Sequence, residues 1–265
     1  MSSASLLPDR RRPLLFAHRG CSSLAPENTM AAFKKARETG APGIELDIHV
    51  CTSGELVVAH DDTFQRTAGD SRTVESLRYG EIKSIDVGSF FSPNFSGERA
   101  PLLDNVLEEF CPGMYIDIEL KTRKTKNDPL PGLLAEKIRQ FGDRAEKSIT
   151  VSSFNPFALL AFKKLCPQIP TAIIWCIDPE VPPILRRGFG RFLSHCDYLK
   201  PEHVQVNRFS HFRLSVLEKK PIVPWTIDDP ALAKRMLQTG CQGIISNRPQ
   251  DMGVVIKSTA QGVAS

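Results

Sequence analysis

Two acidic residues in one apolar run, Glu45 and Asp47, are the strongest sign of chemistry in this chain. Residues i and i+2 of a β-strand point to the same side, so both carboxylates would face one way while Ile44, Leu46 and Ile48 face the other. Two like charges in an apolar setting are costly unless a cation neutralises them. The pattern therefore predicts a cation site rather than a pair of solvent-exposed strand acids.

A second run repeats this alternation with Asp117, Glu119 and Lys121 on one face. Glu119 can complete a three-carboxylate site, and oxygen-only ligands select a hard cation, Mg²⁺ or Ca²⁺, over zinc. Lys121 is placed to hold a phosphoryl oxygen. Asp117 lies nearer the start of the strand, so we expect it to support the site from deeper inside rather than to bind the ion.

Two histidines follow apolar runs, His18 (with Arg19 directly after it) and His60. The guanidinium of arginine offers a fork of donors that matches phosphate oxygens. Cleavage of a phosphodiester needs one group that takes a proton from the nucleophile and one that gives a proton to the leaving oxygen, and two imidazoles suit both tasks. We expect His49 to be a structural residue on the outer face of its strand.

The elements that must position these residues are short apolar runs alternating with helical patterns. The predicted strands are Leu14–Ala17, Gly43–Val50, Met114–Leu120, Ser148–Val151, Thr171–Trp175, Cys196–Leu199, Ile222–Trp225 and Gly243–Ile245. The predicted helices are Thr29–Glu38, Leu130–Phe141, Phe157–Leu165, Arg208–Lys219 and Pro230–Leu237. Eight strands alternating with helices predict an α/β fold of the (β/α)₈ barrel type, with an open doubly wound sheet as the alternative.

One region, from about 61 to 101, breaks the alternation and predicts a small insertion after the second strand, inside a single domain spanning residues 1–265. Its aromatic residues Phe90, Phe91 and Phe95 either pack a small subdomain or line a substrate wall.

Composition excludes several classes of protein. The formal net charge of +4 is too small for a nucleic-acid-binding face, although it suits an anionic small molecule. None of the apolar runs reaches the roughly 20 residues of a membrane span, and none near the start resembles a secretory signal. The seven scattered cysteines favour reduced thiols and a cytoplasmic location. Arg10, Arg11 and Arg12 are expected to form a solvated tail.

Several stretches together resemble the glycerophosphodiester phosphodiesterase family over nearly the whole chain. The matching stretches are AHRGCSSLAPENTMAAF (17–33), GIELDIHVCTSGELVVAHDDTFQRTAG (43–69), IELK (118–121), SSF (152–154), PWTID (224–228) and GCQGIISNRP (240–249). The resemblance implies a (β/α)₈ barrel with an insertion after strand 2.

The resemblance also implies a role for each site residue. The metal ligands would be Glu45, Asp47 and Glu119, the acid–base pair His18 and His60, and the phosphate contacts Arg19 and Lys121. Trp225 is similar to a tryptophan that lines the family's pocket, with a core aromatic as the alternative, and Phe154 carries the same ambiguity.

The expected reaction is metal-dependent hydrolysis of a glycerophosphodiester to glycerol 3-phosphate and an alcohol. The sequence leaves open which histidine is the acid, and whether water or the glycerol 2-hydroxyl attacks. The alternative function is a lysophospholipase D or sphingomyelinase D type of lipid phosphodiesterase. A non-catalytic phosphodiester-binding protein would lack a histidine or a ligand, and none is missing here. The oligomeric state is not indicated.

Overall fold

A curled parallel sheet forms the centre of the molecule. The computed structural model describes Leu7 and residues 13–253. The sheet runs in the order β10-β1-β2-β6-β7-β8-β9, and all of these neighbours pair in parallel. Its strands are β1 (Leu14–His18), β2 (Gly43–Val50), β6 (Tyr115–Leu120), β7 (Ile149–Ser153), β8 (Thr171–Trp175), β9 (Tyr198–Pro201) and β10 (Gly243–Ser246).

The predicted strand Ile222–Trp225 closes the sheet, although it makes only isolated bridges. On one side the amide of Val223 donates to Leu199 of β9 at 2.9 Å, and on the other side the amide of Ile245 of β10 donates to Pro224 at 3.1 Å. Pro224 has no amide hydrogen, so a continuous ladder cannot form here. Since both edges of the sheet bond to this segment, the barrel prediction is confirmed and the open sheet is excluded.

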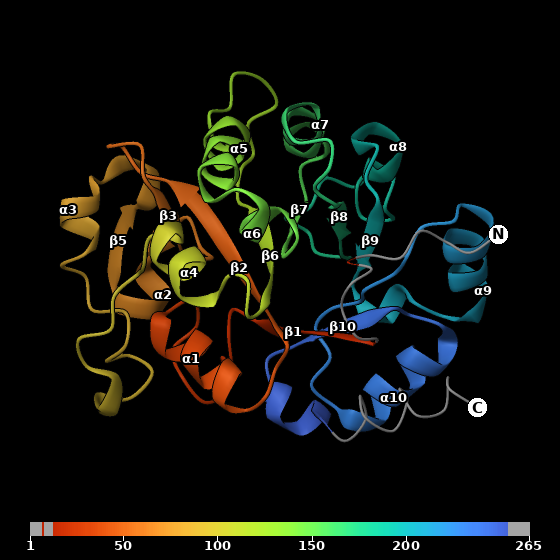
Figure 1. The fold of residues 1–265 in the computed structure, drawn as a ribbon, viewed down its shortest axis with the longest axis horizontal. Coiled ribbons are helices and arrows are strands. Elements are labelled where there is room, and N and C mark those ends of the chain that lie inside the picture. Colours follow the sequence, from red (N-terminus) through yellow and green to blue (C-terminus); the bar gives the residue numbers. More distant parts are fainter. Residues whose placement is uncertain (1–6, 8–12, 254–265) are drawn as a thin grey trace.

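Helices surround the strands (Figure 1). They are α1 (Met30–Glu38), α4 (Leu103–Phe110), α5 (Leu130–Phe141), α6 (Asp143–Glu146), α7 (Pro156–Leu165), α8 (Gly190–Ser194), α9 (Arg208–His211), the π-helix η4 (Phe212–Leu217) and α10 (Pro230–Thr239). Side-chain caps start four of the predicted helices. The hydroxyl of Thr29 accepts from the amide of Ala32, and Asn155, Asn207 and Asp229 cap α7, α9 and α10. The five predicted helices are confirmed, whereas α4, α6 and α8 were not predicted.

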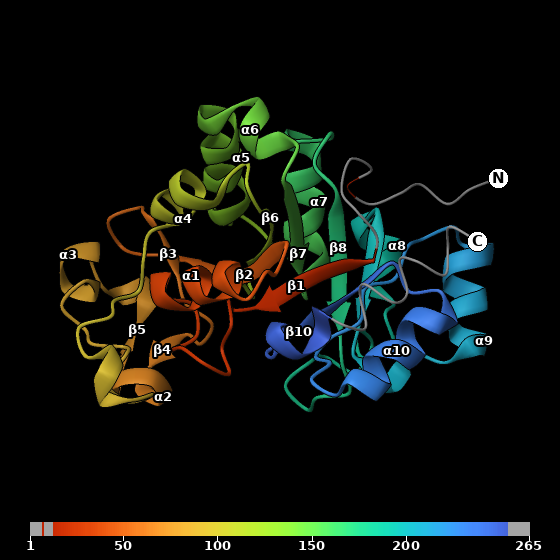
Figure 2. The same ribbon diagram turned by 60° about the horizontal axis from the view of Figure 1, so that its bottom comes forward.

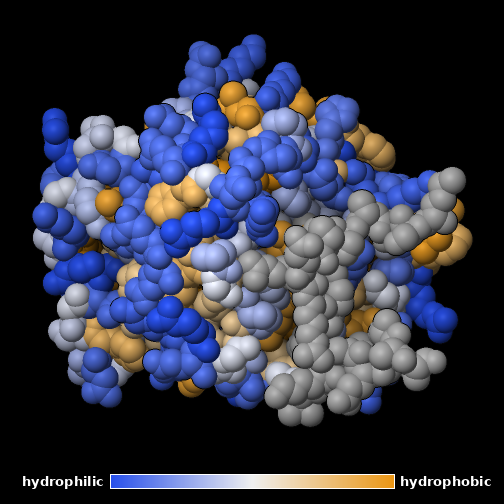
Figure 3. Space-filling view, in the orientation of Figure 1, coloured by the Kyte–Doolittle hydropathy of each residue, from blue (hydrophilic) through white to orange (hydrophobic). Residues whose placement is uncertain are grey.

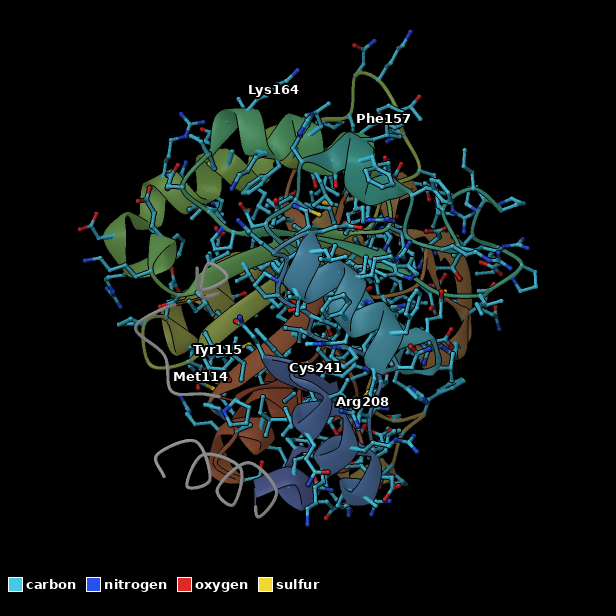
Figure 4. All side chains as sticks on the ribbon, turned by 90° about the vertical axis from the view of Figure 1, so that its right-hand side faces the viewer. Met114, Tyr115, Phe157, Lys164, Arg208 and Cys241 are labelled. Atoms are coloured by element: carbon cyan, nitrogen blue, oxygen red, sulfur yellow. The ribbon has the colours of Figure 1, made fainter. Side chains whose placement is uncertain are left out.

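The core has two layers, one on each side of the strands. Ile44, Leu46 and Ile48 of β2 are fully buried in the outer layer, beneath the helices, as their alternation predicts. The inner layer fills the barrel at the amino ends of its strands. There the rings of Phe16 and Tyr115 meet edge to face with centroids 4.8 Å apart. These amino ends of the strands lie on the side of the barrel where Tyr115 is labelled in Figure 4.

The insertion after β2 has a small core of its own, which includes Phe64 and Val74. Its elements are β3 (Leu56–Val58), which pairs antiparallel with β2, and then β4 (Thr63–Phe64), α2 (Gln65–Ala68), β5 (Asp70–Thr73), η1 (Val74–Ser76), α3 (Tyr79–Ile82) and η2 (Pro93–Phe95). They gather on the left of Figure 2, away from α8. Phe90 and Phe91 are 65% and 45% exposed, and neither these two nor Phe95 lines the large cavity described below. The interpretation of these aromatics as a substrate wall is therefore wrong.

Further expectations concern the cysteines and the surface. All seven cysteines are buried. Within the described residues, no helix is long and apolar enough to cross a membrane. Arg10, Arg11 and Arg12 lie outside the described residues. Hydrophilic residues predominate on the face shown in Figure 3, with an apolar group at its right-hand edge, where α9 lies in Figure 1.

Candidate active site

Three buried carboxylates converge where β2 and β6 end. The register of these strands pairs Asp47 with Glu119, and Glu45 lies two residues before Asp47 on the same face. The three side chains each offer an oxygen within 4.8 Å of the others. Their residues are only 1–7% exposed. The structure thus brings together the three residues that the sequence predicts as metal ligands, in a set that could hold a divalent cation.

Electrostatics in this cluster also suit a cation. Burial, followed by repulsion from Asp47, raises the pKa of Glu45 well above its ordinary value. Burial acts the same way on Asp47, but Lys121, His60 and Arg19 outweigh it and lower the pKa of that carboxyl. A bound cation would stabilise the ionised form of Glu45, so this set of oxygen donors fits a cation.

The two predicted phosphate contacts lie beside the carboxylates. Lys121 Nζ is 3.0 Å from Glu119 Oε1 and 3.7 Å from Asp47 Oδ1. Arg19 Nε is 3.6 Å from Asp47 Oδ2, and the backbone amide of Arg19 donates to Glu45 Oε2 at 3.1 Å. Arg19 has a positive φ of 55°, a left-handed conformation that is uncommon for residues other than glycine. This turn after β1 aims both its amide and its side chain at the acidic cluster.

His18 is held by an amide. Its Nδ1 lies 2.6 Å from Asn247 Oδ1, while the amide nitrogen of Asn247 donates to Asp228 at 2.7 Å. Because Asn247 presents its oxygen, Nδ1 of His18 carries the hydrogen and Nε2 is left with its lone pair, 3.9 Å from Glu45. Burial, then the charge of Arg19, lowers the pKa of His18 to about 3. His18 is therefore a neutral imidazole with a free acceptor nitrogen.

His60 is held by a carboxylate instead. Its Nδ1 lies 2.6 Å from Asp61 Oδ1, and Arg66 Nε donates to the other oxygen of Asp61 at 2.8 Å. The hydrogen bond from His60, together with Arg66, lowers the pKa of Asp61, so this acid is ionised. The ionised Asp61 fixes the orientation of the His60 ring through Nδ1, so Nε2 is left for other contacts.

His49 is not on the outer face of β2, as expected from the sequence. It follows Glu45 and Asp47 at two-residue spacing, so it shares their face, where it is buried and lines the cavity. Its Nε2 lies 3.3 Å from the carbonyl oxygen of His60. Since a backbone carbonyl only accepts, His49 donates this hydrogen bond and helps to hold the segment that carries His60.

Lys200 is a buried residue of the site that the sequence analysis does not predict. Lys200 is 2% exposed, and its Nζ lies 2.8 Å from Asp117 Oδ2 and 2.9 Å from Ser152 Oγ. Asp117 also accepts hydrogen bonds from Ser152 and Tyr198, which is the supporting position expected for it. The two-residue spacing of Tyr198 and Lys200 could have indicated that both side chains lie on the inner face of β9. The predicted strand, however, ends at Leu199 and so leaves Lys200 out.

A second missed residue is Asn28. Its side-chain amide donates to Asp47 Oδ2 at 2.9 Å and so fixes the orientation of that carboxylate. Asn28 lies in the first family-like stretch, directly ahead of Thr29, which caps α1. Its φ of 55° is tolerated by asparagine better than by most residues.

One cavity of about 890 Å³ contains this site. His18, Arg19, Glu45, His60, Glu119 and Lys121 all line it. The two aromatic candidates, Phe154 and Trp225, line it too. Their rings meet edge to face with centroids 5.8 Å apart, and Trp225 Nε1 donates to the carbonyl oxygen of Lys200 at 2.9 Å. Both are therefore cavity residues, although Trp225 also packs against the inner core.

Comparison with known proteins decides the family. The sequence profile of the Glycerophosphoryl diester phosphodiesterase family matches residues 18–251, which include every site residue named above. The chain belongs to this family. It is therefore an enzyme of the phosphoric diester hydrolase class, as the motifs predict.

Individual members of the glycerophosphodiester phosphodiesterase family resemble the chain along nearly its whole length. A glycerophosphodiester phosphodiesterase of Caldanaerobacter subterraneus subsp. tengcongensis is 32% identical over 244 residues, covering 91% of this chain and 96% of the relative. A putative glycerophosphodiester phosphodiesterase of Bacillus subtilis is 33% identical over 239 residues, covering 89% and 94%.

Among solved structures, an Oleispira antarctica phosphodiesterase superimposes with a TM-score of 0.80 at 26% identity. The match covers 93% of this chain and 97% of the other. That structure was determined in complex with the product sn-glycerol-3-phosphate.

Proposed function

We propose that this protein hydrolyses glycerophosphodiesters to sn-glycerol 3-phosphate and an alcohol by two-histidine acid–base catalysis with a divalent cation. The observation that carries the proposal is the placement of His18 and His60 in one cavity with the carboxylate cluster. Each ring uses Nδ1 for a fixed acceptor, so each has Nε2 available for proton transfer. The product bound to the Oleispira relative supports the same substrate class.

Glu45, Asp47 and Glu119 would hold the cation, Mg²⁺ or Ca²⁺. When bound, it supplies positive charge that stabilises the phosphoryl oxygens as the P–O bond breaks. Lys121 and Arg19 would bind the other phosphoryl oxygens, because they lie at the edge of the same cluster.

The partners of the two rings favour opposite roles. His18, neutral and bonded to an amide, is suited to take the proton from the nucleophile. His60, oriented through Nδ1 by the ionised Asp61, would give a proton to the leaving alcohol oxygen. Water and the glycerol 2-hydroxyl are both possible nucleophiles, and phosphorus NMR of the reaction distinguishes them because only the hydroxyl route gives a cyclic phosphate.

We further infer one glycerophosphodiester phosphodiesterase domain over residues 1–265, with the insertion at about 61–101. The buried free thiols support a reducing, cytoplasmic location. They are Cys21, Cys51, Cys166, Cys176, Cys196 and Cys241. Fractionation of the source cells with an antibody against the protein tests this location.

An assay across a panel of glycerophosphodiesters tests the function. Purified protein should release glycerol 3-phosphate from glycerophosphocholine, glycerophosphoethanolamine or glycerophosphoglycerol when Mg²⁺ or Ca²⁺ is present, and excess chelator should abolish the release. Failure on every ester with both cations would contradict the proposal.

A further inference from the structure

The cavity has two chemically different halves. Charged and imidazole side chains from β1, β2 and β6 line the half described above. The other half lies beyond β7 and β8 and is lined by large apolar side chains: Phe154, Phe157, Ile174, Val181, Pro182 and Leu185. A volume of about 890 Å³ is near the upper end of the roughly 300–1,000 Å³ typical of small-molecule sites, so both halves can be filled at once.

The loop that carries Val181 and Leu185 is held in place. The guanidinium of Arg186 donates to the carbonyl oxygens of Val181 at 2.8 Å and Pro179 at 2.9 Å. The amide of Leu185 donates to Pro182 at 2.8 Å, which closes a turn. The apolar side of the cavity is thus formed before any ligand binds, which reduces the ordering cost of binding.

The apolar half reaches the surface. Phe157 lines the cavity and is 44% exposed, and Ile184, in the loop that carries Leu185, is 70% exposed. Figure 4 labels Phe157 and Lys164 near the two ends of α7, and the Phe157 end follows the carboxyl end of β7, where the barrel opens. A long substituent placed in this half can therefore extend out of the cavity.

We propose that this apolar half is a hydrocarbon subsite, which takes the alkyl or acyl chain of a lipid phosphodiester whose phosphate lies at the carboxylate cluster. The inference rests on the proposed function, because it needs the phosphate to lie there. The leaving alcohol, which carries the hydrocarbon chain, would fill space that a glycerol or ethanolamine group leaves empty.

A quaternary ammonium group is the rival occupant. Phe154 and Trp225 are aromatic, and Asp178 and Glu180 line the cavity as well. Glu180 is however 81% exposed and lies 3.7 Å from Arg123, so its charge is largely directed to the rim. The six apolar residues of this half outnumber the two acids, which favours the hydrocarbon chain.

A series of glycerophosphoalkyl esters tests the subsite. The kcat/KM of the wild type should rise from the methyl through the butyl to the octyl ester, by up to about fourfold per methylene, the factor that full burial of a CH₂ allows. The 3,3-dimethylbutyl ester, a neutral isostere of choline, should match glycerophosphocholine within a few fold.

A flat series, or a preference for choline of more than tenfold over its neutral isostere, would overturn the subsite. If even the methyl ester is not hydrolysed, the proposed function fails instead, so the two failures are distinguishable.

Variants locate the subsite. Leu185→Ser and, separately, Val181→Ser should reduce the ratio of octyl to methyl kcat/KM at least fivefold. The matched control is Leu165→Ser, at the other end of α7, where the side chain is 50% exposed and does not line the cavity; its ratio should equal that of the wild type. Unchanged ratios in both loop variants, with unfolding temperatures near the wild type, would overturn the assignment to this loop.

Discussion

At the scale of single residues, the site is defined by what holds each catalytic group. His18 donates to a neutral amide and His60 to a carboxylate, so two identical side chains are prepared for different steps. The sequence predicts the histidines and carboxylates because each lies next to a recognisable apolar run. It does not predict Asn247 as the partner of His18, since 229 positions separate them and only the closed barrel brings them together.

Replacing either histidine tests its role. His18→Ala and His60→Ala should each lower kcat by about 10²–10⁴-fold, because each removes one proton-transfer group. Circular dichroism should show an unchanged fold. Normal turnover in both variants would remove the basis of the proposed mechanism.

Asn247 tests the tautomer of His18. Asn247→Ala removes the acceptor at Nδ1, so the ring can protonate at Nε2 and turn, and kcat should fall about 10- to 100-fold while KM changes little. Asn94→Ala, in the exposed η2 turn, is the matched control and should leave both constants unchanged. An equal loss in the two variants would show that Asn247 has no special role.

At the scale of elements, alternation along β2 and β6 predicted the inner and outer faces correctly, because a residue period of two is fixed by backbone geometry. The same rule places His49 on the inner face, because it lies two residues after Asp47. The prediction that it lies on the outer face is therefore wrong. The loop after β8 carries no such period, and its contribution to the cavity emerges only from its tertiary contacts, above all those of Arg186.

Gly43, at the start of β2, should tolerate no side chain. A Cβ there would lie 1.9 Å from the ring of Tyr115, whose hydroxyl is bonded to Leu15 at 2.7 and 2.9 Å. Gly43→Ala should lower the free energy of unfolding by about 1–3 kcal/mol or more through overpacking. Gly132→Ala, in α5 with no atom within 4 Å, should raise it by about 0.5–1 kcal/mol. Urea unfolding measures both, and equal effects would contradict this account.

Asp86 should make the stability of the insertion depend on pH. Hydrogen bonds from the amide of Gly97 and from Ser89, with a further one from Gly88, lower the pKa of Asp86 below its ordinary 3.8. A lowered folded-state pKa adds stability that is present above about pH 4 and is lost as the pH falls towards the folded value.

Asp86→Asn should therefore unfold at lower denaturant concentration than the wild type at pH 7, and the difference should shrink below pH 4. Asp143→Asn, whose side chain is 88% exposed, is the control. A difference that stays constant from pH 7 to pH 3 would exclude this role for the Asp86 carboxylate.

At the scale of the whole molecule, barrel closure gathers groups that are distant in the sequence into one balanced charge cluster. Its named members are four carboxylates and three cations: Glu45, Asp47, Asp117 and Glu119, with Arg19, Lys121 and Lys200. With all four carboxylates ionised, this set carries one excess negative charge, and a divalent cation with a singly charged phosphodiester would bring it to neutrality. The fold and most of the site were predictable, but this balance was not, because Lys200 belongs to no recognisable motif.

Cation binding without substrate follows from this balance. Mg²⁺ or Ca²⁺ at 100 times its Kd should stabilise the protein by about 2.7 kcal/mol, seen as a raised unfolding temperature. Glu119→Gln should weaken cation binding in calorimetry, since it removes one ligand, whereas Glu108→Gln, at an exposed position of α4, should not. An unchanged Kd in Glu119→Gln would show that the cation binds elsewhere.

The cluster of Glu45, Asp47 and Glu119, together with the two histidines, is the proposed site of glycerophosphodiester cleavage. The most direct test measures release of glycerol 3-phosphate from glycerophosphocholine by the wild type and by Glu119→Gln, each with Mg²⁺ or Ca²⁺ and with excess chelator. We predict rapid release by the wild type with cation, and a loss of at least a hundredfold with chelator or in Glu119→Gln. Equal rates in all of these reactions would contradict the account.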